Sequence, residues 1–103
     1  MKVGHITSLQ PCPQRDVELR ISPDELFSAI SDPPGAIKAS GVVGYDVVEK
    51  RRWWGSALYH LYVRLSAGDS VLFYTAAKQF DIALLLDEFE ASLRNVPRTW
   101  KKA

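Results

Sequence analysis

The chain has 103 residues, a formal net charge of +1, a hydrophobic fraction of 47% and a single cysteine, Cys12. This length predicts one domain, residues 1–103, large enough to bury a core without metal or disulfide staples. The near-zero charge excludes a global electrostatic attraction to nucleic acid or membranes, so any basic surface is local. One cysteine cannot form an internal disulfide, which favours a reducing compartment.

The N-terminal residues lack the apolar stretch of a signal peptide. The longest strongly apolar run in the second half, residues 82–86, is too short to cross a bilayer. These features predict a cytoplasmic protein with no membrane partner. Residues 3–9 fit either a short strand or part of a loosely ordered arm over residues 1–15, because Pro11 and Pro13 interrupt regular structure there.

A strand followed by a helix is predicted after the arm. Apolar and charged residues alternate over 17–21, which indicates a half-buried strand. Residues 22–25 then place serine at a cap, proline at the first helical position and glutamate three residues after the cap, the pattern of a capping box. The apolar residues of 26–30 share one helical face, and Pro33 and Pro34 end the helix.

Three strands are predicted in the middle of the chain. Residues 36–44 leave three alternatives open: a second short helix, a loop, or the start of a strand. Short polar breaks that contain glycine, at 55–56 and 67–69, are typical of hairpin turns. The strands that these breaks separate are 45–54, 57–65 and 71–76.

The last predicted element is a long helix over residues 80–95. Its apolar residues recur near a 3.6-residue period, its acidic residues lie mostly off that face, and Pro97 ends it. A basic tail, residues 98–102, follows. The order of strand, helix, three strands and helix predicts an α+β two-layer sandwich. In that fold two main helices cover one face of an antiparallel sheet of three to four strands.

No recognisable catalytic machinery is present in the sequence. His5 and His60 are the only histidines, and with Cys12 they lack the close spacing of a zinc site. There is no nucleophile elbow, and the acidic residues of the last helix fit a solvated face. The prediction is a protein that is not an enzyme and has no metal or cofactor.

One local feature points to a nucleic acid: three cations are followed by two indoles, with a further cation on the next predicted strand. Cations contact phosphates, and indoles stack on bases. The candidate nucleic-acid-binding residues are Lys50, Arg51, Arg52, Trp53, Trp54 and Arg64. Two other interpretations stay open. One tryptophan fills the core while the cations solvate a strand end, or the segment is a protein interface, where Trp and Arg are enriched.

The pattern over residues 59–93 is a strand, a tight turn at 67–69, a strand and a helix. It resembles the small dimerising subunit of the KEOPS (EKC) complex, which makes the threonylcarbamoyladenosine modification of tRNA. Residues 17–30 fit the first strand and helix of that family. Two features differ from it: apolar residues replace polar and basic ones at 82–86, and the segment 33–56 is longer. The resemblance implies a subunit that dimerises, docks on a catalytic subunit and helps to hold tRNA.

The first functional prediction is therefore a non-catalytic assembly or dimerisation subunit in a homo- or hetero-oligomer. Its predicted interface residues come from the sheet and the last helix: Tyr62, Tyr74, Leu85 and Phe89. One alternative is a nucleic-acid-binding module that holds RNA with segment 50–54. The other is a small helix-grip protein, in which a curved sheet wraps the long helix around an apolar ligand cavity.

Overall fold

The computed structural model describes residues 4–6, 18–51, 57–93 and 95–102. They form two four-stranded sheets, one α-helix and one short 3-10 helix. Sheet A is antiparallel and follows chain order: β1 (Gly4–Ile6), β2 (Leu19–Ile21), β3 (Glu25–Ser28) and β4 (Ile37–Lys38). Sheet B has the order β7 (Ser70–Ala76), β6 (Leu58–Leu65), β5 (Val42–Lys50) and β8 (Arg98–Lys102). The helices are η1 (Ala39–Gly41) and α1 (Gln79–Ser92).

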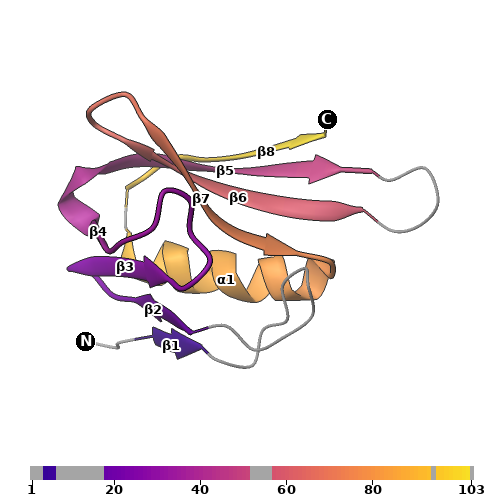
Figure 1. Cartoon of the computed structure of the whole chain (residues 1–103), viewed down its shortest axis with the longest axis horizontal. Helices are drawn as coiled ribbons and strands as arrows, with labels where there is room; N and C mark the ends of the chain where they lie inside the picture. The colour runs from indigo at the N-terminus through magenta and orange to yellow at the C-terminus, as the bar shows by residue number, and fades with distance from the viewer. Residues whose placement is uncertain (1–3, 7–17, 52–56, 94, 103) are drawn as a thin grey trace.

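Helix α1 packs against both sheets, through β2 of sheet A and through β6 and β7 of sheet B (Figure 1). The helix face that the 3.6-residue period predicts is buried: Ile82, Leu85, Leu86 and Phe89. The rings of Tyr45 and Phe73 lie 5.1 and 5.3 Å from the Phe89 ring, between centroids. These tilted and edge-on contacts fix α1 against one face of sheet B.

Strand β6 lies within the predicted strand 57–65, and its side chains alternate between the two faces of sheet B. Leu61 and Val63 are fully buried on the face toward α1, while His60 and Tyr62 are partly exposed on the opposite face. We call this opposite face the outer face. The turn between β6 and β7 is also present, and Gly68 adopts a φ of 100° in it, a conformation that glycine adopts without strain.

The predicted fold class is wrong in three respects. The structure has one α-helix among its described residues where two were expected, two sheets where one was expected, and a parallel strand in sheet B. The helix expected after Ser22 is a hairpin turn leading into β3. The Ser22 hydroxyl accepts the N–H groups of Asp24 and Glu25, at 3.3 and 3.1 Å. This bonding pattern serves a tight turn as well as a helix cap.

The burial of β3 follows a period of two rather than the predicted helical period. Leu26 and Ser28 are buried, while Phe27 points to the other side of sheet A. There the guanidinium of Arg20, its cross-strand partner, lies 4.6 Å from the centre of the Phe27 ring. Pairing with β2 thus gives both faces of this segment a contact that an isolated helical turn would lack.

Strand β8 is the basic tail, for which the sequence predicted no structure. It runs parallel to β5, and one polar cluster on the outer face connects it to two other strands. The Asp46 carboxylate of β5 accepts a hydrogen bond from the Thr99 hydroxyl of β8 and pairs with the Arg64 guanidinium of β6, at 3.0 Å. A Cβ on Gly44 would overlap that guanidinium, so glycine leaves the space that Arg64 needs to reach Asp46.

The effect of Gly44→Ala on stability should depend on Arg64. In an Arg64→Gln background, alanine should stabilise the strand by about 0.5–1 kcal/mol, because it is less flexible than glycine when unfolded. With Arg64 present, the gain should be smaller by about 0.5–1 kcal/mol, the upper part of the range for a partly exposed ion pair. Chemical denaturation of the four proteins in a double-mutant cycle measures this difference. Additivity within about 0.3 kcal/mol would contradict the role given to Gly44.

Candidate functional site

The parallel pairing of β5 and β8 brings two basic segments from distant parts of the chain together. Val48 lies opposite Lys101, and Glu49 lies opposite Lys102. Lys50 and Arg51, which follow Glu49, are therefore at the same end of sheet B as the two tail lysines. All four cations are exposed. We call Lys50, Arg51, Lys101 and Lys102 the basic corner.

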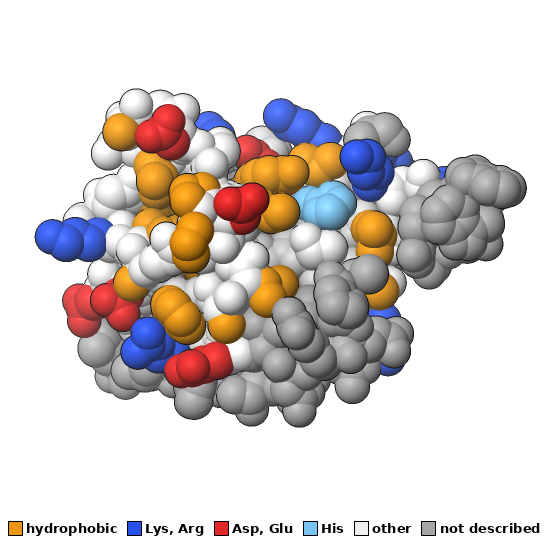
Figure 2. Space-filling view, viewed as in Figure 1, with side chains coloured by type: hydrophobic (Ala, Val, Ile, Leu, Met, Phe, Trp, Pro, Cys, Tyr) orange, Lys and Arg blue, Asp and Glu red, His pale blue; other side chains and the backbone are white. Residues whose placement is uncertain are grey.

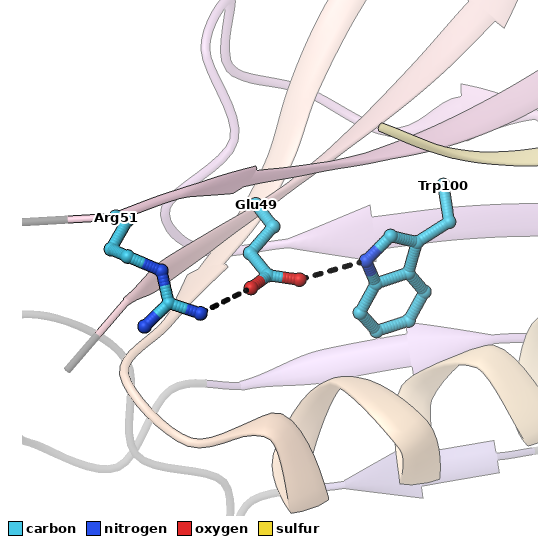
Figure 3. A network of polar contacts seen from close by, with 3 residues as sticks. All are labelled: Glu49, Arg51 and Trp100. Carbon is cyan, nitrogen blue, oxygen red and sulfur yellow. Dashed lines mark hydrogen bonds and ion pairs between the residues drawn. The ribbon is translucent and has the colours of Figure 1, made fainter. Parts of the chain in front are cut away.

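A polar network at this corner orients the one tryptophan that the structure describes (Figure 3). The Trp100 indole N–H donates to the Glu49 carboxylate at 3.1 Å, and the same carboxylate pairs with Arg51 at 3.5 Å. The Trp100 ring also meets Tyr59 edge-on, with centroids 6.1 Å apart. Trp100 is 39% exposed. Its ring is thus held in place while part of its surface stays open to a ligand.

The structure places the predicted nucleic-acid-binding residues in different locations. Arg52, Trp53 and Trp54 lie outside the described residues. Lys50 and Arg51 belong to the basic corner, but Arg64 does not, because it lies opposite Gly44 and pairs with Asp46. Trp100, Lys101 and Lys102 are not among the predicted site residues, although the sequence identifies the two lysines as part of a basic tail. The alternation of residue types over 99–101 is only a weak indication of a strand. Nothing in the local sequence indicates that this strand lies beside β5.

The predicted interface residues also lie in two different environments. Tyr62 is on the outer face of sheet B, opposite Leu72 and partly exposed. Tyr74, Leu85 and Phe89 are fully buried, so these three side chains belong to the core of the protomer rather than to a contact surface. Periodicity identified them as members of apolar faces, but it could not say which faces the chain itself covers. On the face viewed in Figure 2, hydrophobic side chains lie in separate patches, with polar and charged side chains between them.

His60 lies on the outer face beside the basic corner. Its Nδ1 is 3.0 Å from the Thr75 hydroxyl, and its ring is 6.4 Å from the Tyr62 ring, between centroids. Burial lowers the pKa of His60 below its usual value of 6.5, and the Lys50 ammonium lowers this pKa further. The neutral imidazole is therefore the favoured form at neutral pH.

Sheet B has two edge strands, β7 and β8. The edge of β7 is paired at one point, where Leu72 and Asp32 exchange two backbone hydrogen bonds of 2.9 Å. Among the described residues, β8 pairs with β5 alone. The Tyr45 N–H donates to the Pro97 carbonyl at 3.1 Å, so the backbone groups of Pro97 point toward β5. By alternation, the residues whose backbone N–H and C=O point away from β5 are Arg98, Trp100 and Lys102.

A groove of about 350 Å³ lies elsewhere on the surface, between the segment after β3 and the turn after β6. Its lining is largely apolar and includes Pro33, Ile37, Leu65 and Val71, with Lys38 as its one charged residue. Within the described ranges no three metal-binding side chains gather, and no helix combines the length and apolar character needed to cross a bilayer.

No protein-family model, curated protein or solved structure matches this chain significantly. The resemblance to the small KEOPS subunit therefore stays a prediction. One element of it has changed, because the segment compared with the first helix of that family is the β2–β3 hairpin.

The pKa of His60 should lie below 6.5 and should rise in Lys50→Gln, while staying below 6.5 because burial is its larger cause. NMR titration of the imidazole signals measures it, with His5→Gln for assignment. Since the unfolded chain binds more protons, His60 should contribute stability above about pH 6.5 that is lost as the pH falls. An unchanged pKa in Lys50→Gln would contradict this account.

Proposed function

We propose that this chain is a non-catalytic assembly protein that takes up an extended segment of a partner along the open edge of β8. The observation that carries the proposal is the unpaired edge of a five-residue strand, whose outward backbone groups have no partner among the described residues. A strand added there would be held by main-chain hydrogen bonds, with side chains giving specificity. Exposed strand edges readily pair with other chains unless something prevents it.

Three features support β8 as a prepared contact strand rather than a loose end. Thr99 and Trp100 attach it to β5 through Asp46 and Glu49, so its geometry exists before a partner arrives. Trp100 is an aromatic residue with part of its ring exposed, the kind of side chain that dominates binding energy at interfaces. The outer face of sheet B, with Tyr62 partly exposed, lies next to the edge and offers further contact area.

A test of strand addition is the comparison of Lys102→Pro with Lys102→Ala. Both variants remove the charge, but only proline removes the outward N–H, and neither affects the ladder with β5. The ligands are blocked seven-residue peptides with acidic, neutral or basic residues at alternate positions, titrated by NMR of the β8 amides. Binding to Lys102→Pro should be about 3- to 10-fold weaker than to Lys102→Ala, the value of one backbone hydrogen bond. Equal affinities would overturn the proposal, as would a panel that leaves every β8 amide unshifted.

Single-stranded nucleic acid is the second candidate partner, and the basic corner is the observation that favours it. Lys50 and Arg51 end β5 where Lys101 and Lys102 end β8, and Lys101 and Lys102 have no ion pair with any described residue. Four adjacent cations and one exposed indole can contact a phosphodiester backbone and stack on a base.

If this candidate is correct, a fluorescent twelve-residue oligothymidylate should bind in low salt, and its affinity should fall steeply as salt rises. The double variant Lys50→Gln, Arg51→Gln should weaken binding and flatten the salt dependence, because two phosphate contacts are lost. The matched control is Arg20→Gln with Lys38→Gln, which removes two exposed cations of sheet A, away from the corner. Equal weakening in the control and the double variant would indicate non-specific attraction and exclude the corner as a site.

A further inference from the structure

The edge of β8 presents its side chains in a fixed order to an added strand. Arg98, Trp100 and Lys102 lie on the face toward α1, and Thr99 and Lys101 lie on the outer face. In an added strand, residues opposite each other share a face, so every second residue meets Arg98, Trp100 and Lys102 in turn. The partner segment therefore meets cation, aromatic and cation on one face.

A second copy of β8 is a poor occupant of this edge. Two registers pair all five residues. The antiparallel register places Arg98 opposite Lys102 twice, and the parallel register places Arg98, Lys101 and Lys102 each opposite its own equivalent. Like charges directly opposite each other on neighbouring strands are destabilising. The charges of β8 thus disfavour self-pairing, and they complement a partner of the opposite sign.

The charge of this edge is only partly neutralised within the protomer. Lys102 has no ion pair with any described residue. Arg98 pairs with Glu90 at 3.4 Å, but this carboxylate is 70% exposed, so the pair is weak and leaves other guanidinium N–H groups available. Between the two cations, the exposed part of the Trp100 ring, which packs edge-on against the buried Tyr59, forms an apolar surface.

From this order of charges we infer that the segment taken up at β8 has an acidic-x-apolar-x-acidic pattern. The inference rests on the proposed strand addition and specifies its ligand. One acidic side chain lies opposite Arg98 and the other opposite Lys102, while the apolar side chain covers Trp100. The pattern reads the same in both directions, so it holds whether the added strand runs parallel or antiparallel to β8.

A peptide fits this edge better than a nucleic acid does. Arg98, Trp100 and Lys102 each direct one N–H donor and one C=O acceptor outward, and a peptide backbone supplies the complement to both. A phosphodiester backbone supplies acceptors only, so the outward carbonyls would lose water without gaining a donor. The chain as a whole carries a net charge of only +1, where nucleic-acid-binding domains are usually strongly basic.

The test compares two blocked peptides of identical composition and charge. The patterned peptide is Thr-Glu-Thr-Val-Thr-Glu-Thr. The control is Thr-Thr-Glu-Val-Glu-Thr-Thr, in which valine lies on the opposite face from both glutamates. Affinities are measured by NMR from the β8 amides and the Trp100 indole N–H, with oligothymidylate as a third ligand at the same salt. The patterned peptide should bind about tenfold more tightly than the control.

Each outcome decides a separate point. Equal binding of the two peptides at β8 would overturn the inferred pattern, because charge alone would then explain the affinity. It would not decide strand addition, which the comparison of Lys102→Pro with Lys102→Ala tests separately. Tighter binding of the neutral seven-residue peptide from the panel of the strand-addition test would overturn the acidic preference. Tighter binding of oligothymidylate would overturn the inference in favour of a nucleic acid. If no peptide shifts the β8 signals, the proposed strand addition fails as well.

Discussion

The candidate site depends on the attachment of β8 to β5, in which two carboxylates, Asp46 and Glu49, supplement the backbone ladder. Asp46 accepts the Thr99 hydroxyl from one neighbouring strand and pairs with Arg64 from the other, so it connects three strands of sheet B on the outer face. Gly44 makes this arrangement feasible by leaving room for the guanidinium. Without β8 beside β5, Lys101 and Lys102 would not lie near Lys50 and Arg51, and Trp100 would lose its hydrogen bond to Glu49.

Sequence reasoning succeeded where local pattern and burial agree. The alternation around Leu61 and Val63, and the helical period from Ile82 to Phe89, both reflect a single covered face, so β6 and α1 could be predicted. At Ser22 the local signal was ambiguous, because a hydroxyl that accepts nearby N–H groups occurs in turns and at helix caps alike. Pairing with β2 decided between them, and that is a property of the tertiary structure rather than of the motif.

Strand β8 was beyond local reasoning for a different reason. Its one apolar residue is Trp100, so it has no repeating hydrophobic pattern, and its partner β5 is about fifty residues away in the chain. The candidate site likewise has one part that local sequence indicates and one part that only long-range pairing creates. The cations at Lys50 and Arg51 could be recognised as a cluster, but the contribution of Lys101 and Lys102 depends on the long-range register. The assembly prediction from the resemblance and the strand addition proposed from β8 agree in kind, since both describe a protein that acts by holding a partner.

The weak burial of β8 has a consequence for how the protein opens. A strand held by one hydrogen-bond ladder and a few polar contacts is expected to separate from the sheet at a lower free energy than global unfolding requires. Its separation would bare the edge of β5, a nine-residue strand that contains four valines. The partly open state would therefore be more prone to aggregation than the native one. A bound segment that holds β8 in place would lower the population of that state by mass action, so occupancy of the edge would protect the whole chain.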